Sequence, residues 1–317
     1  TSVTNGLPLS GRNRYTVAGK SPLTGGFGEA EAGGFWGPEL KRTGFDGVIV
    51  HGQSETPVYL YVSDGVCEIR DATKYWGKLA GEVQDELVED LDDKRIRVLQ
   101  TGVSGENLVL YAAIVNELRH FHGRAGLGAV MGSKKLKAIV VRGRERIRPE
   151  APEDAKEVLQ WWRDNYDQEA DGMHQFGTAG GVGGLDLDGI LPTRNFRDGS
   201  FEEAQNITGQ TMANTILVNR GTCYSCGVAC KREVEIEERG VSAKYGGMEY
   251  EIIGALGSCC GVGDLGAVAE GSQLVNQYVL DGISAGVAIA FAMEAYENGV
   301  LTKADTDGID LTFGNAD

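Results

Sequence analysis

The sequence predicts an α+β protein, with a β-rich N-terminal domain followed by a mainly α-helical domain. Short β-branched or aromatic runs are concentrated before residue 145, and helical spacing of apolar residues dominates after residue 150. The Pro- and charge-rich segment RIRPEAPED (146–154) separates the two patterns. We therefore expect domains at 1–148 and 149–317, within a chain long enough for two ordinary domains.

The N-terminal domain is predicted from its β-type runs. Strands are expected at 14–19, 47–52, 58–62, 66–70, 95–102, 108–115 and 136–141. The tripeptide SDG at 63–65 is a good hairpin turn between two of these strands. Val83, Leu87 and Leu91 have helical spacing, so a helix is expected at 81–91.

The C-terminal domain is predicted from longer segments with helical character. Its first helix is expected at 151–167, where Pro152 falls near the first turn. Further helical segments are expected at 208–219, 249–257, 264–280 and 281–299. The second domain is therefore expected to be mainly α-helical.

Composition narrows the class of protein. The net charge of −16 argues against nucleic acid or an anionic membrane surface as the main partner. The best apolar run, 285–293, is far shorter than the roughly 20 residues of a membrane-spanning helix. The start lacks a signal-peptide pattern and an initiator Met, and we expect the chain to be a piece of a longer cytoplasmic protein.

Three cysteines form the pattern C-x2-C-x3-C in GTCYSCGVACKRE (221–233). Cys223, Cys226 and Cys230 would let one loop present three sulfurs to one metal centre. Zinc usually takes paired C-x2-C knuckles, and no second pair exists here. An iron–sulfur cubane fits better, because three ligands commonly come from one loop. Three unrelated buried cysteines are the alternative.

The fourth ligand of such a cluster is not fixed by the pattern. Within the chain the candidates are Cys67, Cys259 and Cys260. The adjacent pair in GSCCGVG (257–263) is also explained as small core residues at a helix end, because free cysteine is among the most buried residue types.

Glycine-rich stretches dominate the first domain. The chain has 47 glycines in 317 residues, about twice the usual 7% frequency. Three stretches, 11–26, 29–47 and 119–137, mix Gly with Arg, Lys, Ser or Thr, as in loops that bind phosphates. Ordinary turns between strands explain them equally well.

The segment EYE (249–251) opens an apolar helical run. Carboxylates at this position favour the positive end of a helix, which is one explanation. The other is a buried Glu251 with a raised pKa that takes part in proton transfer.

Eight segments match one known family in its own order. They are RYTVAGKSPLTGG (14–26), AGGFWGPELKRTGFDGVIVHG (32–52), SGENLVLYAAI (104–114), GRAGLGAVMGSKKLKAIVV (123–141), LPTRNF (191–196), CYSCGVAC (223–230), MEYEIIGALGS (248–258) and LDGISAG (280–286). Together they resemble the tungsten-dependent aldehyde:ferredoxin oxidoreductase family. The match covers nearly the whole chain, begins inside the family's first domain and stops before its third.

The resemblance implies a bis-molybdopterin cofactor that carries tungsten, or molybdenum in some relatives. It also implies a [4Fe–4S] cluster and a magnesium ion that bridges the pterin phosphates. The first domain would form a two-sheet base under the pterins. The fourth cluster cysteine and a histidine near the metal would lie in the third domain, and Cys259 and Cys260 would be core residues.

Several residues receive roles from the resemblance. Cys223, Cys226 and Cys230 would be cluster ligands. Arg14 would lie between cluster and pterin. Glu31, where the family often has Asn, and Gly33 fall in the loop that cradles the pterin and its magnesium-bridged phosphates.

Further pterin contacts come from two more segments. Gly123 and Arg124 match family contacts, while His120 and Phe121 replace the usual Arg and Ala. The motif Asp-x-x-Gly-Leu-Asp spans 276–281 here and keeps its last two residues, Leu280 and Asp281, with Asn276 in place of the first Asp.

The resemblance also places a catalytic carboxylate and bears on a second metal site. Glu251 matches a glutamate near the metal that is proposed to handle the proton of an attacking water. Some members bind iron at a dimer interface through Glu-x-x-His, whereas this chain has Glu270 and Gln273 at those positions.

The implied reaction is two-electron oxidation of an aldehyde, with water, to a carboxylic acid. Ferredoxin would accept the electrons one at a time, and a homodimer is one possible assembly. One alternative is a pterin and iron–sulfur subunit of a larger reductase complex, such as one that acts on aromatic thioesters. Another is a non-catalytic electron-transfer or structural metal protein built around the three cysteines.

Overall fold

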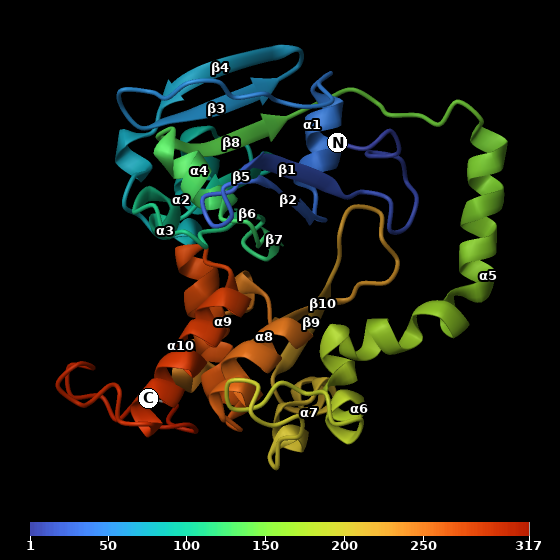
Figure 1. Cartoon of the computed structure of the whole chain (residues 1–317). Helices are drawn as coiled ribbons and strands as arrows, with labels where there is room; N and C mark the ends of the chain where they lie inside the picture. Colours follow the sequence, from blue (N-terminus) through green and yellow to red (C-terminus); the bar gives the residue numbers. More distant parts are fainter. Residues whose placement is uncertain (317) are drawn as a thin grey trace. The chain divides into compact units, whose positions relative to one another are not determined.

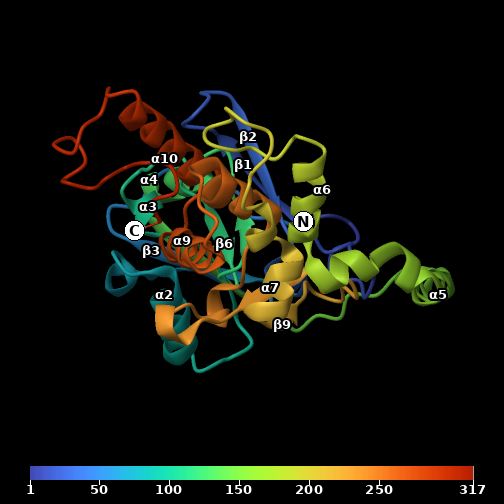
Figure 2. The ribbon, with the colours of Figure 1, turned by 90° about the horizontal axis from the view of Figure 1, so that it is seen from below.

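The computed structural model describes residues 1–316, which form two compact units. Unit 1 comprises residues 1–171, 222–229 and 276–281, and unit 2 comprises residues 172–221, 230–275 and the described residues from 282 onward. Figures 1 and 2 show the chain in two views. The division follows spatial contacts, and the boundary after residue 148 stays a prediction.

Unit 1 contains eight strands and several short helices. The strands are β1 (Tyr15–Lys20), β2 (Phe27–Ala32), β3 (Val58–Ser63), β4 (Val66–Asp71), β5 (Arg97–Thr101), β6 (Ile114–Asn116), β7 (His120–His122) and β8 (Leu136–Arg142). The helices are α1 (Trp36–Arg42), α2 (Ala80–Asp90), α3 (Val103–Glu106), α4 (Leu127–Ser133) and most of α5 (Pro152–Phe176), with a 3-10 turn at Thr73–Tyr75.

Two sheets make up the β-structure of unit 1. The larger sheet has the order β4-β3-β8-β5-β6-β7, in which only β3 and β8 are parallel. The smaller sheet is the antiparallel hairpin β1–β2, visible in Figures 1 and 2. The N-terminal part is therefore β-rich, as predicted, and a two-sheet base under a pterin stays a prediction.

The core of unit 1 forms on both faces of the six-stranded sheet. All seven residues of β8 are buried, which is typical of a central strand. Val141 packs with Tyr15 of the hairpin and Trp36 of α1 on one face. On the other face, Val140 packs with Leu87 of α2.

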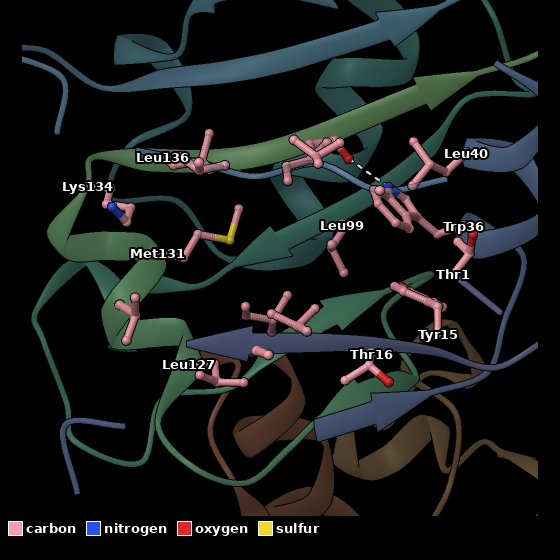
Figure 3. A pocket seen from close by; sticks show the side chains of 18 residues that line it. Thr1, Tyr15, Thr16, Trp36, Leu40, Leu99, Leu127, Met131, Lys134 and Leu136 are labelled. Carbon is pink, nitrogen blue, oxygen red and sulfur yellow. Dashed lines mark hydrogen bonds between the residues drawn. The ribbon is translucent and has the colours of Figure 1, made fainter. Parts of the chain in front are cut away.

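An apolar cavity of about 210 Å³ lies between the hairpin and the six-stranded sheet, as Figure 3 shows. Leu99, Met131 and Leu136 line it, and the Trp36 indole beside it donates a hydrogen bond to the Ile139 carbonyl at 2.8 Å. Most of the residues that line it are apolar and belong to the core cluster of unit 1, with Thr1, Thr16 and Lys134 as the polar members, so we assign the cavity to the core.

Unit 2 is mainly helical with one two-stranded sheet. Its elements are the end of α5, α6 (Val182–Leu187), α7 (Gly209–Thr215), β9 (Leu217–Gly221), β10 (Lys231–Val234), α8 (Tyr250–Ile252), a π-helical turn (Ile253–Gly257), most of α9 (Leu265–Tyr278) and α10 (Gly282–Glu297). Short 3-10 turns lie at Thr178–Gly181, Ala204–Ile207, Glu237–Arg239, Ala243–Tyr245 and Ser258–Cys260.

The cysteine pair of unit 2 is part of its core. Cys259 and Cys260 are buried with residues such as Ile253 and Met293, which confirms the prediction that they are core residues. Burial raises the pKa of the Cys260 thiol to about 12, so this thiol is held in its neutral form.

Some predicted elements were wrong. Residues 47–52 form no strand, because no neighbouring strand among the described residues supplies backbone partners. Their side chains nevertheless alternate, since Val48 and Val50 pack inward and Ile49 is exposed. The strand expected at 108–115 is confined to β6, since Leu108 has a left-handed φ of 58°. The helix expected at 208–219 ends at Thr215, where the β-branched run that follows forms β9.

All three predicted glycine-rich loops contain regular structure. The stretch 11–26 contains β1, the stretch 29–47 contains the end of β2 and all of α1, and the stretch 119–137 contains β7 and α4. Their glycines therefore allow close packing as well as turns. No single helix within residues 1–316 is long and apolar enough to cross a membrane, although the bent pair Tyr250–Cys260 and Leu265–Tyr278 passes the same test jointly by length and composition.

Candidate active site

Unit 1 joins the first part of the cysteine loop to the loop that follows β2. The Cys223 sulfur lies so close to Gly33 that a Cβ on Gly33 would be 2.6 Å from it. The Tyr224 N–H donates to the Gly34 carbonyl at 3.1 Å, which fixes the two loops to each other. The sequence predicted a cofactor role for both loops, and the structure brings them together.

Backbone geometry at Gly34 explains why this turn needs glycine. Gly34 has a φ of 96°, which side-chain-bearing residues rarely adopt. A Cβ there would also be 2.1 Å from the Asn116 Oδ1 atom and 2.6 Å from a Glu117 carboxylate oxygen. The glycine pair therefore lets the backbone approach both the cysteine loop and the end of β6.

The cysteine loop is a tight turn with several backbone and hydroxyl contacts. The Cys226 N–H donates to the Cys223 carbonyl at 3.1 Å, and the Thr222 hydroxyl donates to the Cys226 carbonyl at 2.5 Å. The Ser10 hydroxyl lies 3.6 Å from the Cys226 sulfur and accepts the Gly227 N–H at 3.1 Å. Both thiols are half-buried, so they are available to a ligand yet held in place.

Cys230 belongs to unit 2, immediately before β10. Within residues 1–316, no group of three or more His, Cys, Asp or Glu side chains is arranged so that it could hold a metal ion. The assignment of Cys223, Cys226 and Cys230 as one ligand set stays a prediction. All six cysteines are free thiols.

Arg14 and Glu31 form an ion pair next to this junction. The Arg14 Nε atom lies 3.1 Å from the Glu31 carboxylate, and its guanidinium also donates to the Glu31 carbonyl at 3.3 Å. Both side chains are more than half exposed. Glu31 lies two residues before Gly33, so the predicted Arg14, Glu31 and Gly33 do lie together.

His120 connects β7 to the same junction. Its ring is buried, and its Nδ1 atom lies 3.8 Å from the Cys223 sulfur. Asn116, opposite His120 in the β6–β7 pair, donates to the His120 carbonyl, the Gly33 carbonyl and the Tyr15 hydroxyl. Phe121, the next residue of β7, is half-buried.

A second predicted group assembles at the other end of β7. Arg124 forms an ion pair with the buried Asp281 at 3.5 Å, and Gly123 lies against the same carboxylate. Leu280 makes an isolated β-bridge with Ala112. The segment 276–281 belongs to unit 1, so Asn276, Leu280 and Asp281 share that unit with the first-domain residues.

Glu251 and the nearby Glu249 differ in their exposure and in their contacts. Glu251 is exposed, so the buried position considered for it was wrong. Glu249 binds the Lys231 ammonium at 2.7 Å and the Thr178 hydroxyl at 2.6 Å. Burial alone would raise the pKa of Glu249, but Lys231 and Thr178 outweigh it and lower that pKa.

The structure adds polar groups that sequence reasoning missed. Glu117 accepts the Phe35 N–H at 3.0 Å, and burial raises its pKa to about 7 although Arg97 and Arg119 favour the charged form. His122 lies against the Tyr15 ring, and burial lowers its pKa to about 4. No motif signals either residue, because their burial depends on the tertiary fold.

Three polar atoms near the two loops are buried without a hydrogen-bond partner in the described structure. They are Asn116 Oδ1, Glu117 Oε1 and His122 Nε2. Buried polar atoms are normally paired with protein groups or ordered water, so these three atoms have hydrogen-bonding capacity left for water or a bound group. Together with two held thiols and the glycine loop, these atoms fit a large polar and metal-containing group.

Comparison with known proteins places this chain in a family. Residues 1–143 match the family model of the aldehyde ferredoxin oxidoreductase N-terminal domain, and residues 154–317 match that of domains 2 and 3. The chain belongs to the aldehyde ferredoxin oxidoreductase family. Tungsten-containing aldehyde ferredoxin oxidoreductases of Pyrococcus abyssi and Thermococcus kodakarensis are 39% and 40% identical to it over 321 residues.

These relatives cover 98% of this chain, and the chain spans about half (52%) of their length. A solved structure is also similar: the active site complex BamBC of benzoyl coenzyme A reductase, with 1,5-dienoyl-CoA. The similar region covers 96% of this chain and 48% of the chain in that structure, with a TM-score of 0.81 and 29% sequence identity. The family membership confirms the resemblance seen in the sequence.

Proposed function

We propose that this aldehyde ferredoxin oxidoreductase family member oxidises aldehydes to carboxylic acids in the cytoplasm and passes the electrons to ferredoxin. The balanced reaction consumes one aldehyde and one water and releases a carboxylic acid, two protons and two electrons. A tungsten or molybdenum bis-molybdopterin with a [4Fe–4S] cluster would supply the redox chemistry when bound. The observation that carries this proposal is the packing of Cys223 on Gly33 in a chain of this family.

Residues of unit 1 would supply most of the contacts to the two groups. Cys223 and Cys226 would ligate the cluster, together with Cys230. The Gly33–Gly34 turn would bring the backbone close to the pterin and its magnesium-bridged phosphates. Arg14 would donate charge-assisted hydrogen bonds between cluster and pterin, a role that its exposed guanidinium and its anchor on Glu31 support.

The second pterin contact would be the group at the end of β7. Arg124 would bind an anionic part of the cofactor, since its guanidinium is 67% exposed while its partner Asp281 is buried. Asp281 would hold Arg124 in place, and a Cβ on Gly123 would be 4.0 Å from the Asp281 carboxylate. His120 and Phe121 would replace the family's usual Arg and Ala beside these contacts.

Proton handling is proposed for Glu251. Its exposed carboxylate lies in the first turn of α8, directly before a π-helical turn. Such turns often mark functional sites. Glu251 would accept a proton from the attacking water, whereas Glu249 stays bound to Lys231.

The proposed function predicts a reaction that can be assayed directly. The natively purified protein should reduce ferredoxin when an aldehyde is added, and should form the matching carboxylic acid at one mole per two electrons. Glu251→Gln should abolish most of this turnover while metal content is kept. An active protein whose ferredoxin reduction does not require an aldehyde would contradict the proposal.

The BamBC similarity favours one second candidate. In it, the chain would be a subunit of a larger reductase complex that acts on an aromatic thioester. Co-purification of other subunits with the native protein, and reduction of an aromatic coenzyme A thioester without aldehyde turnover, would support that candidate instead.

A further inference from the structure

Beside the cysteine loop, unit 1 has a hollow of about 340 Å³ that is lined by arginines, here called the arginine hollow. It is lined by Gly6, Pro8, Arg42, Gly143, Arg144, Glu145, Arg146, Ile147, Arg148 and Tyr224. Four of these residues are arginines and only Glu145 is acidic. This concentration stands out in a chain with 46 acidic and 30 basic residues.

Local contacts hold the walls of the hollow in place. The Glu145 N–H donates to the Arg42 carbonyl at 3.0 Å, which ties the segment after β8 to the end of α1. Ile147 packs against Gly6, whose missing Cβ would be 2.9 Å from it. The arginines after β8 are therefore displayed from an anchored segment.

Tyr224 forms the wall that belongs to the cysteine loop. The Arg42 guanidinium donates to the Tyr224 hydroxyl at 2.6 Å and lies over its ring at 4.8 Å from the centroid. Phe35 makes an edge contact with the same ring. Since Tyr224 lies between Cys223 and Cys226 in the sequence, whatever fills the hollow contacts the loop that carries both thiols.

The charge of the hollow is not neutralised from within. Arg42 is paired with Glu39 at 3.3 Å, and Arg144 with Asp64 at the same distance. Arg146 and Arg148 are exposed and make no ion pair with any described residue. The hollow therefore presents two free guanidinium groups to solvent.

We propose that the arginine hollow is the docking surface for an acidic electron-carrier protein, placed against Tyr224 and the cysteine loop. This inference rests on the proposed function, because it assumes that the cysteine loop exchanges electrons with a carrier. A carrier with a negative surface is repelled by the net charge of the chain and attracted by the hollow. Such steering raises association rates and fixes orientation.

The exposure of the arginines favours a protein over a small anion. A small anion is typically bound by donors that converge on it, whereas Arg146 and Arg148 are exposed on a segment without regular secondary structure. Exposed cations of this kind create a broad positive surface that matches another protein's acidic surface. Nucleic acid is disfavoured by the net charge of −16.

The test is the double charge reversal Arg146→Glu with Arg148→Glu in the native holoenzyme. The matched control is Lys20→Glu with Lys74→Glu, which makes the same change in charge at two exposed cations of unit 1. The probe is a purified acidic ferredoxin, and its affinity is measured by calorimetry at low and high salt. Turnover with a cationic viologen dye as electron acceptor is measured in parallel.

We expect the reversal to weaken ferredoxin binding by about tenfold or more at low salt, because opposite charges become like charges. The salt dependence of ferredoxin binding should largely disappear in this variant, while its turnover with the viologen stays at the parent level. The control pair should bind ferredoxin within about twofold of the parent.

Equal ferredoxin affinity and salt dependence in the reversal and the parent would overturn the proposal. So would tight binding of inorganic phosphate that the reversal abolishes while ferredoxin binding is unchanged. Failure of the proposed function has a different signature, since the parent would then lack aldehyde turnover with the viologen as well.

Discussion

The contact between Gly33 and Cys223 provides a prediction whose size follows from the structure. In Gly33→Ala the new Cβ would lie 2.6 Å from the Cys223 sulfur, whereas ordinary contacts begin at 3.4 Å. The sulfur must therefore move by about 0.8 Å, the difference between these distances. Gly33 does not have a positive φ, so alanine adds this steric conflict and no backbone strain.

Two consequences are expected for Gly33→Ala. Overpacking of this kind costs about 1–3 kcal/mol in the free energy of unfolding. A cluster holds its ligand sulfurs at fixed bond lengths, so a shifted Cys223 should lower iron and sulfide content well below that of the parent. Both quantities are measurable, by denaturant unfolding of cofactor-free protein and by iron and sulfide analysis with visible absorption of the native protein.

The matched control is Gly47→Ala. No atom lies within 4 Å of the Cβ that this change adds, and Gly47 also lacks a positive φ. It should keep both stability and iron content. If Gly33→Ala retained the parent's iron, sulfide and absorption spectrum, the Cys223 position in this structure would not be the one used by a cluster.

Three further predictions concern unit 1. Burial raises the pKa of Glu117 from 4.5 to about 7, so the native state binds more protons than the unfolded state between these pH values. The free energy of unfolding should therefore fall by about 3 kcal/mol (2.5 units at 1.36 kcal/mol each) between pH 4.5 and 7 and then level off. Glu117→Gln should flatten this part of the pH profile of urea unfolding, and parallel profiles would refute the assignment. Lys137 is fully buried beside Glu106, so Lys137→Met should lower the free energy of unfolding by about 3–5 kcal/mol. Lys156 is in an exposed ion pair, so Lys156→Met should lower it by less than about 0.5 kcal/mol. Equal unfolding midpoints in urea for the two variants would be inconsistent with the burial of Lys137. Asp281→Asn removes the charge that holds Arg124, and it should reduce the pterin released on acid treatment; an unchanged pterin content would remove that residue from the site.

Much of the fold could be predicted because local signals agreed with tertiary structure. The SDG turn joins β3 and β4 as expected, and the apolar run at 136–141 forms the buried central strand β8. The strand predicted at 47–52 was wrong because alternation of apolar residues predicts only which side chains are buried, whereas a strand also needs a neighbouring strand to hydrogen-bond with.

The residues of the candidate site could be predicted only where they belong to a sequence motif. The cysteine loop was found from its spacing, whereas the cofactor role of the Gly33 loop came from the family resemblance. The structure packs these two loops on each other. Glu117 and Arg42 were missed because their roles depend on contacts distant in sequence. The Arg42–Tyr224 contact joins residues 182 positions apart, and the left-handed φ of 47° at Glu117 has no sequence signal.

The metal content of the natively purified protein tests the proposed cofactor set. We expect about four iron atoms and four sulfides per chain, as a [4Fe–4S] cluster requires, together with tungsten or molybdenum and released pterin. Cys223→Ser should lose iron in the same analysis. Zinc as the only bound metal, with no pterin, would contradict the account.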